Sequence, residues 1–443
     1  MVEVLTAAWL GDCDDTTACV MVRSNVPGTI SVAGQSATVD PTVTGAESDD
    51  GVARFDVPHG THAISINGVQ YDTITTKRPP TGQEFELGWG SCQNTKRDTV
   101  MGHVLAARNL ACFAWIGDYI YTLEGHGKTI FGRQKQAIYS MASPTHQDVY
   151  RHYQQAHLVP GNRALHRSCP TYWIGDDHEE ISADNWDNTL TQLNSNGASL
   201  GSTQADVTYY GDMGERCMEI YFGGNPLSGG AFRHMYWHKR IQHVELFCLN
   251  EVHYRTALAT ADSDTSKKFI TDTMMAQLKA DMAASTATFK VFLSPKKFWK
   301  NVGDNDDILY RYQVQRDELA DWMAANLTGA VILAGDKHCP DISYDSTREL
   351  LQVNACAMTQ YNQIYGHGIG YAEHNQWKPF GYDGKPPAAL QSNLGGELHC
   401  AGVLRVTPEY IEPLIVYESG YEVSAGRIYA GSNERILRPV AVG

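Results

Sequence analysis

The sequence predicts a small β-sandwich followed by a larger α/β layered domain. Over the first 80 residues, short β-branched runs are separated by Gly, Pro, Asn and Asp, as in a small antiparallel sandwich. After the stiff polar segment Lys77–Gly82, short apolar strands alternate with helical stretches, which is typical of an α/β layered domain. A chain of 443 residues has room for two domains. We therefore expect a sandwich over residues 1–80 and a second domain over residues 83–443.

The expected elements follow from these patterns. The strands of the first domain are predicted at Ala18–Arg23, Thr29–Val32, Ala37–Val39, Val52–Val57, Ala63–Ile66 and Val69–Thr75. The helices of the second domain are predicted at Met101–Asn109, Arg133–Met141, Asp148–His157, Lys267–Ser285 and Asp317–Asn326. The stretch Asn185–Asn225 is rich in Asn, Ser, Thr and Gly, and we expect it to be a long loop or an insertion over one face.

Composition and charge exclude several classes of protein. The chain is 42% hydrophobic and 19% charged, so it can bury a large core. Its 35 Lys and Arg against 50 Asp and Glu give a net charge of -15. This charge counts against a nucleic-acid or anionic-membrane binder and is compatible with binding metal cations. No run of about 18 apolar residues occurs, so we expect no membrane-spanning helix.

The N-terminus and the cysteines bear on location. The first residues lack the basic leader and the apolar core of a signal peptide, so we expect a cytoplasmic or virion-associated protein. The 10 cysteines include no CxxC pair, which favours free thiols in a reducing compartment. Cys112, on an apolar strand, is expected to be a core residue.

Four predicted strands are each followed directly by residues that can bind metals. The dipeptide Gly-Asp alone is a weak signal, because it is ordinary turn chemistry, but three of its occurrences follow strands. Ligands bind beyond the carboxyl ends of strands in open α/β sheets, so these side chains are expected to meet at one edge. Oxygen, nitrogen and sulfur donors together are what a polynuclear metal site needs. The four segments are Phe85–Trp89 before Gly90-Ser91-Cys92, Ala111–Ile116 before Gly117-Asp118-Tyr119-Ile120-Tyr121, Thr171–Ile174 before Gly175-Asp176-Asp177-His178-Glu179, and Ala330–Ala334 before Gly335-Asp336-Lys337-His338.

In these motifs the sequence resembles the calcineurin-like metallophosphoesterase superfamily, and within it the PhoD-like alkaline phosphatases and phosphodiesterases. Gly117-Asp118-x-x-Tyr121 resembles the GDxxY motif, Asp176-Asp177-His178-Glu179 the DDHE motif and Gly335-Asp336-Lys337-His338 the terminal GDxH motif. The segment from Ala8 to Arg23 resembles the opening of the family's N-terminal domain. The resemblance covers nearly the whole chain. It implies a fibronectin-like β-sandwich followed by a four-layer α/β/β/α metallophosphoesterase domain.

The resemblance also implies a metal centre of ferric iron (Fe3+) and calcium (Ca2+), with other divalent metals as alternatives. Thiolate, phenolate and imidazole donors suit ferric iron, whereas oxygen donors suit calcium. Carried over residue by residue, the family pattern places iron ligands at Cys92, Tyr121 and His338, a bridging ligand at Asp118, and divalent-metal ligands at Asp177, Asp336 and Asn185, with Asp184 next to the last.

The reaction implied by the resemblance is hydrolysis of phosphate monoesters or diesters. Bridging metals lower the pKa of a bound water and produce a metal-bound hydroxide, which attacks phosphorus in line. The expected substrate is a phosphate-ester small molecule or a phosphodiester, and no stable nucleic-acid partner is expected. His178 would lie beside the phosphate as an electrostatic or proton-donating group. The candidates for a cationic phosphate clamp are Lys337, Arg151 and Arg255.

Two features leave alternatives open. The family's LDtRqYR segment reads Leu249–Arg255 (LNEVHYR) here, without its carboxylate and one of its arginines, and a non-catalytic structural or binding module, for example in a virion or a surface assembly, would tolerate that change. The complete ligand set argues against such a module, which has no need of it. Gly197–Gly201 fits the GxSxG nucleophile elbow with Ser199 as nucleophile, but no strand precedes it, so a loop is favoured.

Overall fold

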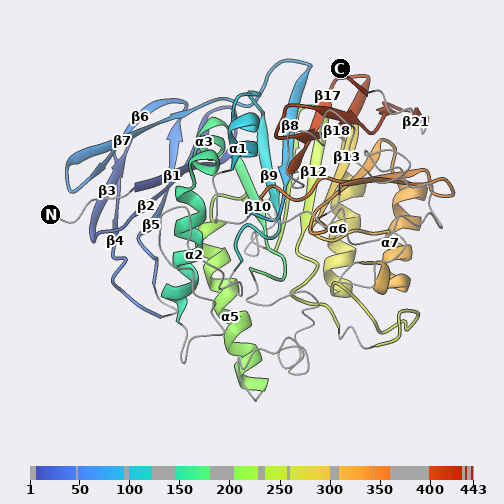
Figure 1. Cartoon of the computed structure of the whole chain (residues 1–443), viewed down its shortest axis with the longest axis horizontal. Helices are drawn as coiled ribbons and strands as arrows, with labels where there is room; N and C mark the ends of the chain where they lie inside the picture. The colour runs from blue at the N-terminus through green and yellow to red at the C-terminus, as the bar shows by residue number, and fades with distance from the viewer. Residues whose placement is uncertain are drawn as a thin grey trace.

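The structure of the chain is a computed structural model in which layers of helices and sheets stand beside two small N-terminal sheets (Figure 1). It describes residues 6–45, 48–93, 99–121, 145–179, 204–227, 235–256, 260–299, 309–338, 340–359, 399–431, 435–436 and 441–442. The predicted helix Arg133–Met141 and the Gly197–Gly201 motif lie outside these residues. No helix in the described ranges is long and apolar enough to cross a membrane.

The N-terminal region forms two antiparallel sheets. Their facing sides share one apolar core that includes Val20, Ile30, Phe55 and Ile64, because alternate residues of each strand point inward. Each of the six predicted strands lies within an observed one, which confirms the sandwich expected from the sequence. One sheet has the order β1-β2-β5 (Thr6–Cys13, Thr17–Ser24, Val52–Pro58), and the other has the order β4-β3-β6-β7 (Gln35–Val39, Gly28–Val32, Gly60–Ile66, Val69–Thr76).

Two larger mixed sheets form the centre of the molecule. The first has 9 strands, with β10-β9-β8-β17-β18-β19-β22 as its main path; β20 pairs with β18, and β21 pairs with β20. Their bounds are Thr171–Ile174, Cys112–Ile116, Phe85–Gly90, Cys400–Val406, Tyr410–Tyr417, Glu422–Ser424 and Ala441–Val442, then Arg427–Tyr429 and Arg435–Ile436. The second has 6 strands in the order β11-β12-β13-β14-β16-β15. Their bounds are Tyr236–Ile241, Val244–Leu249, Phe289–Ser294, Ala330–Ala334, Leu350–Asn354 and Asp341–Asp345.

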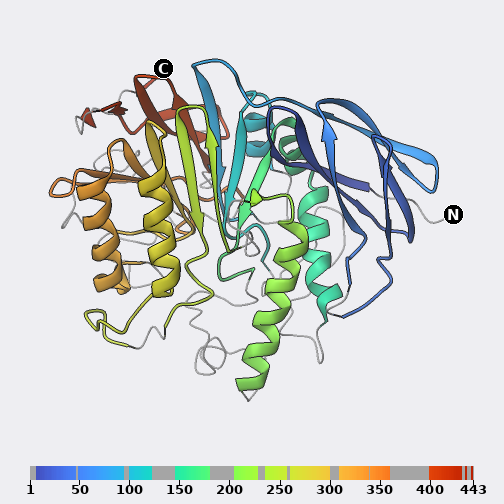
Figure 2. The same ribbon diagram turned by 180° about the vertical axis from the view of Figure 1, so that it is seen from behind.

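The two large sheets pack face to face and are covered by helices on their outer sides (Figures 1 and 2). Residues of both sheets, such as Trp89, Ile116 and Leu333, share the apolar core between them. Helices α1, α2, α3 and α5 (Val100–Ala106, His146–Leu158, Pro160–Ser168, Gln204–Tyr221) pack on the first sheet. Helices α6 and α7 (Asp272–Ala284, Gln313–Asn326) pack on the second, and the short turn η3 (Leu309–Arg311) comes just before α7. This arrangement confirms the four-layer α/β/β/α domain.

Helix α5 corrects one expectation. The sequence predicts a long loop or an insertion over one face at Asn185–Asn225, and the loop alternative is wrong for the helix Gln204–Tyr221 within it. Its internal glycines lower helix propensity, which is why the local pattern indicates a loop. The helix is stabilised instead by tertiary contacts, since Met213, Cys217 and Tyr221 lie on one face and are buried in the core against the first sheet.

The N-terminal sheets pack against the helices of the second domain through aromatic side chains. The ring of Trp9 on β1 lies 4.4 Å from that of His157 on α2 and stacks on Tyr221 of α5 at 6.0 Å. Arg23 and Asp50 form a buried ion pair at 3.0 Å, and the hydroxyl of Tyr221 donates a hydrogen bond to the same carboxylate. The sandwich is therefore joined to the layered domain by both apolar and charged contacts.

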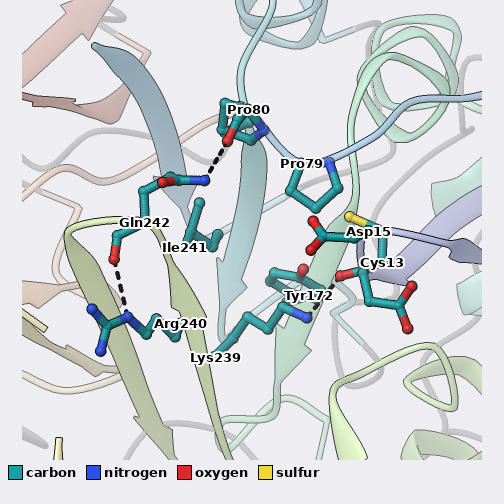
Figure 3. Close-up of a pocket in the computed structure, with 11 residues that line it drawn as sticks. Cys13, Asp15, Pro79, Pro80, Tyr172, Lys239, Arg240, Ile241 and Gln242 are labelled. Carbon is teal, nitrogen blue, oxygen red and sulfur yellow. Dashed lines mark hydrogen bonds between the residues drawn. The ribbon is translucent and has the colours of Figure 1, made fainter. Parts of the chain in front are cut away.

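A cavity of about 210 Å³ lies at the amino ends of β9 and β10, away from the strand ends that carry the metal-binding motifs (Figure 3). It is bounded by the β1–β2 turn, by Pro79 and Pro80, and by β11. Lys239 lines this cavity and forms an ion pair with Asp12 at 2.7 Å. Gln242 Nε2 donates a hydrogen bond to the Pro80 carbonyl at 2.8 Å. These polar contacts tie the segment between the two regions to the edge strand of the second sheet.

Two buried histidines predict how stability depends on pH. Burial lowers the pKa of His157 to about 3 and lowers that of His166 well below its ordinary value. The Nε2 atom of His166 accepts a hydrogen bond from Trp115 Nε1 at 3.0 Å, which requires the neutral ring. Both rings are therefore neutral in the fold, and only the unfolded chain takes up protons below an ordinary pKa of about 6.5.

Above pH ~6.5 both histidines are neutral in the folded and the unfolded chain, so they do not lower the free energy of unfolding. As the pH drops from there toward 3, protonation of the unfolded chain should lower that free energy. At pH 5 each histidine should lower the free energy of unfolding by about 2 kcal/mol relative to its value at pH 8. Urea unfolding at several pH values measures this dependence. His157→Phe should flatten it, whereas His103→Gln, at an exposed position of α1, should not. An unchanged dependence in His157→Phe would contradict the assignment.

Candidate metal centre

The candidate centre lies where the carboxyl ends of the two large sheets meet. Strands β8, β9 and β10 run parallel in the first sheet, and β12, β13, β14 and β16 do so in the second. The two edges touch, since the Asp336 amide donates to Ser91 Oγ at 3.1 Å and Cys92 Sγ donates to the Asp336 carbonyl at 3.3 Å. Gly335 permits this approach because it has no side chain. A Cβ at this position would lie 2.8 Å from Ile116 O and from Ser91 Oγ, which is too close for a van der Waals contact.

The strands present their chemically active side chains at one common position. In each case such a side chain lies two residues beyond the last residue of the strand. Because the parallel strands end side by side, side chains at this position converge. The residues are Cys92 after β8, Asp118 after β9, Asp176 after β10, Glu251 after β12, Lys296 after β13, Asp336 after β14 and Cys356 after β16.

One part of the centre, which we call the sulfur half, consists of Cys92, Tyr121, His338 and Cys356. The two Sγ atoms and one imidazole nitrogen lie within 4.8 Å of one another, and the Sγ atoms are 2.9 Å apart. The hydroxyl of Tyr121 lies 3.2 Å from His338 Nε2. Burial raises the pKa of the Cys92 thiol well above its ordinary value, and the neighbouring Cys356 adds to this. A bound cation would reverse that effect and favour the thiolate.

The other part, which we call the oxygen half, consists of Asp118, Asp176, Asp177 and Asp336. One carboxylate oxygen from each lies within 4.8 Å of the others. The Lys296 ammonium, whose side chain is fully buried, lies 2.9 Å from Asp176 Oδ2 and 2.8 Å from Asp177 Oδ1. It also lies 3.1 Å from Asp336 Oδ1. Burial acts to raise the pKa of Asp177, but the charge of Lys296 outweighs it and holds that pKa below its ordinary value.

Asp118 joins the two halves. Its Oδ2 accepts hydrogen bonds from Cys92 Sγ at 3.4 Å and from the Tyr121 hydroxyl at 3.1 Å. Its Oδ1 is buried and has no hydrogen-bond partner among the residues that the structure describes. Burial raises the pKa of Asp118 well above its ordinary value, and the charges of Asp177 and Asp176 raise it further. A buried carboxylate oxygen without a donor calls for a cation, so the residues present fit a metal bound at this point.

Three residues of the centre share an uncommon backbone conformation. The φ angles of Cys92, Asp118 and Asp336 are 60°, 54° and 60°, in the left-handed region that residues other than glycine seldom adopt. Such strain persists only where the surroundings impose it, and it is concentrated at functional sites. Gly117 lets the chain turn into Asp118, because a Cβ at Gly117 would lie 2.5 Å from Asp176 Cβ.

Glu179, the last residue of the DDHE motif, holds these turns in place. Its buried carboxylate accepts hydrogen bonds from the backbone amides of Asp118 and Asp176 at 2.9 Å each and from that of Ile120 at 3.1 Å. Burial raises the pKa of Glu179 to about 7, although the amide donors act to lower it. Glu179 therefore positions two of the carboxylates of the oxygen half through their own backbone.

Glu251 supports the end of β13 in the same way. Ser294 Oγ donates to its two carboxylate oxygens at 2.9 and 2.8 Å, and the Lys296 amide donates to Oε2 at 3.3 Å. Burial raises the pKa of Glu251 to about 8, against the effect of these donors. The segment Leu249–Arg255, which departs from the family pattern, thus supplies a buried carboxyl group beneath the centre.

The structure brings most of the predicted site residues together. These are Cys92, Asp118, Tyr121, Asp177, Asp336 and His338. The predicted catalytic group His178 is almost fully buried beside them, with its ring centroid 4.1 Å from that of Tyr121. Lys337 follows Asp336 in the same turn, and its carbonyl oxygen accepts a hydrogen bond from Asn354 Nδ2 at 2.9 Å.

Other predicted residues lie elsewhere. Arg151 is on α2, its side chain is 65% exposed, and it pairs with Asp148 at 2.9 Å, so it is not brought to the centre. Asn185, Asp184 and Ser199 lie outside the described residues.

Sequence reasoning missed Cys356 and Lys296. Both follow apolar runs, Leu350–Asn354 and Phe289–Ser294, at the same distance as the predicted ligands Cys92, Asp118 and Asp336 follow theirs. The signal was therefore present, since the rule applied to four strands also holds for these two. Neither residue belongs to a motif of the family, which is why the resemblance did not point to them.

The donor set suits two kinds of cation. Two thiols, a phenol and an imidazole in the sulfur half match a transition metal such as iron. The carboxylates alone match a hard divalent cation such as calcium or manganese. A four-layer fold with such a centre at the strand ends defines the class of the metallophosphoesterases.

The chain belongs to the PhoD-like phosphatase family, whose sequence profile matches residues 87–349. Among solved structures, one described as the structure of PhoD is similar over 99% of this chain and 92% of its own, with a TM-score of 0.71 and 15% sequence identity. That similarity supports the fold. A second, described as GAP50, the anchor in the inner membrane complex of Plasmodium, has a TM-score of 0.35 and 8% identity over 79% of this chain and 90% of its own. A comparison with curated proteins found no match.

The role of Glu179 can be tested by Glu179→Gln. The amide keeps one acceptor oxygen but turns an NH2 group toward at least one backbone N–H, which leaves a buried donor unsatisfied. The free energy of unfolding should fall by about 2–3 kcal/mol, measured by urea unfolding. Glu318→Gln, at an exposed carboxylate that meets Lys279, should change it by less than about 0.5 kcal/mol. Equal, small effects of the two changes would mean that Glu179 does not hold the turns.

Proposed function

We propose that the chain is a metal-dependent phosphoric ester hydrolase, acting on phosphate monoesters or diesters. The observation that carries the proposal is the single buried centre in which Asp118 joins a sulfur half to an oxygen half at the strand ends of a PhoD-like phosphatase. We further propose that residues 83–443 carry this activity. A structural module would have no use for several buried carboxylates whose desolvation costs several kcal/mol for each ion.

The sulfur half is the proposed binding site of a transition metal, and the family resemblance implies that this metal is ferric iron. Cys92, Tyr121 and His338 would hold it together with Asp118, and Cys356 joins this set because its sulfur lies among theirs. For the oxygen half the resemblance implies calcium, held by Asp177 and Asp336.

The metal, when bound, supplies a water of lowered pKa that can attack phosphorus at neutral pH. Residues of the chain would hold the metal and bind the phosphate. Asp118 would help to hold the metal, and the buried His178 would lie beside the phosphate as a hydrogen-bond or proton donor. Lys337, in the turn after β14, and the buried Arg255 are the proposed cationic contacts to the phosphate oxygens. Arg151 is left out of this set because it is exposed on α2 and pairs with Asp148.

Asp118→Asn tests the proposed function. The change removes the charge that joins the two halves while keeping the shape of the side chain, so hydrolysis of an aryl phosphate should fall by more than about 100-fold. Circular dichroism should show an unchanged fold. Asp281→Asn changes a carboxylate on α6 that accepts hydrogen bonds from Tyr236 and Gln277, and this variant should keep its activity. Full activity in Asp118→Asn, or no hydrolysis by the metal-loaded wild type, would overturn the proposal.

The proposed sulfur ligands can be counted with cobalt. Co2+ bound to thiolates gives a near-ultraviolet charge-transfer band whose intensity grows with the number of sulfur ligands. We expect Cys92→Ser and Cys356→Ser each to lower that intensity by about half. Cys112→Ser removes a buried thiol from the core between the sheets and should leave the band unchanged. A full-strength band in Cys356→Ser would exclude that sulfur as a ligand.

A further inference from the structure

Lys296 has an unusual place for a lysine. Its side chain is fully buried, and its ammonium is within 3.1 Å of three different carboxylates. Those carboxylates are three of the four members of the oxygen half. A lysine is almost never fully buried unless it is paired, and two of the three carboxylates that pair with it here, Asp177 and Asp336, were predicted to bind a metal.

The chain builds a dedicated support for this lysine. Lys296 lies two residues beyond β13, the position from which β14 presents Asp336 and β16 presents Cys356. Its backbone amide donates to Glu251, and its carbonyl oxygen accepts a hydrogen bond from Ser294 Oγ. The ammonium therefore reaches the carboxylates from a backbone position that corresponds to those of the proposed ligands.

We propose that the ammonium of Lys296 takes the place of the second cation, so that the chain works with one metal ion, in the sulfur half, instead of two. This inference rests on the proposed function and specifies its metal requirement. A divalent cation that bound Asp176, Asp177 and Asp336 would have to lie at about 2.0–2.6 Å from their oxygens. The space equidistant from those oxygens is where the ammonium lies.

The charges of the two halves are consistent with this division. Lys296 pairs with the carboxylate of Asp177, whereas Asp118 directs Oδ2 toward Cys92 and Tyr121. The buried Oδ1 of Asp118 has no hydrogen-bond partner among the described residues. One metal at Asp118 and one ammonium at the other carboxylates would together offset much of the negative charge of the centre.

The consequence for catalysis concerns the phosphate. A two-metal site holds the attacking and the leaving oxygen on separate ions. With an ammonium in one position, the second contact to a phosphate oxygen would be a charge-assisted hydrogen bond from a fixed donor. Activity should then show no requirement for calcium once the sulfur half is loaded.

Metal stoichiometry tests the inference directly. Metal-free protein is equilibrated with cobalt chloride, and bound Co2+ is measured by elemental analysis and by electron paramagnetic resonance. The wild type should bind about one ion per chain, with the signal of an isolated Co2+. Lys296→Met removes the charge and keeps the length, so it should bind about two ions and give the signal of a spin-coupled pair. Lys267→Met, at a lysine whose side chain is also fully buried but pairs with Asp262, should behave as the wild type does.

The outcomes separate this inference from the proposed function. Two tightly bound ions in the wild type would overturn the inference even if the enzyme hydrolyses phosphate esters. One ion in both the wild type and Lys296→Met would also overturn it, because the vacated position would then not be a cation site. If Lys296→Met does not fold, the wild-type stoichiometry decides alone. One bound ion without hydrolysis would support the inference on the metal and refute the proposed activity.

Discussion

The burial of negative charge at the meeting of the two large sheets is the constraint on which the rest of the structure depends. Asp118, Asp176 and Asp177 are fully or almost fully buried, and one oxygen of each lies within 4.8 Å of the others and of Asp336. Carboxylates so close together in a medium of low dielectric constant cannot all be ionised without cations. The structure supplies one such charge itself, from Lys296, and leaves Asp118 directed toward thiols and a phenol. The fold is thus arranged so that the proposed metal would complete the charge balance.

The four layers make this burial possible. Strands such as β9 and β14 are buried along their whole length because each sheet is covered on both faces, so their sequences are continuous apolar runs. Parallel strands that end together place one side chain each at the same edge, and Gly335 lets the two edges come into contact. Below the donors, Glu179 and Glu251 accept backbone amides and hold the turns. The functional side chains are therefore fixed by a rigid scaffold, with strain confined to Cys92, Asp118 and Asp336.

The N-terminal sheets contribute to the same scaffold from the side. Trp9 packs against His157 and Tyr221, which lie on the two helices that cover the first large sheet. His166 on α3 in turn accepts a hydrogen bond from Trp115 of β9, two residues before the turn that carries Asp118. Packing of this kind links the sandwich to the strand that supplies the bridging carboxylate. We infer that the sandwich supports the position of β9.

Much of this molecule could be predicted from the sequence. Period-two and continuous apolar runs predict the strands, because burial of side chains on one or both faces is a local property of each run. The ordered motifs that end with Tyr121, Glu179 and His338 predict the class of site, because each motif lies within a single turn. The helix Gln204–Tyr221 was not predictable from local propensity, since its stability comes from tertiary burial.

What only the tertiary structure decided is which distant residues share the centre. Cys356 lies 264 residues from Cys92 in the sequence, and Lys296 lies 119 residues from Asp177. Such contacts depend on how two separate sheets are placed against each other, and no local pattern records that placement. The sequence by itself determined the strands and the chemical groups at their ends. The packing of the sheets determined that a second sulfur and a lysine ammonium join them, because only there do the strand ends meet in space.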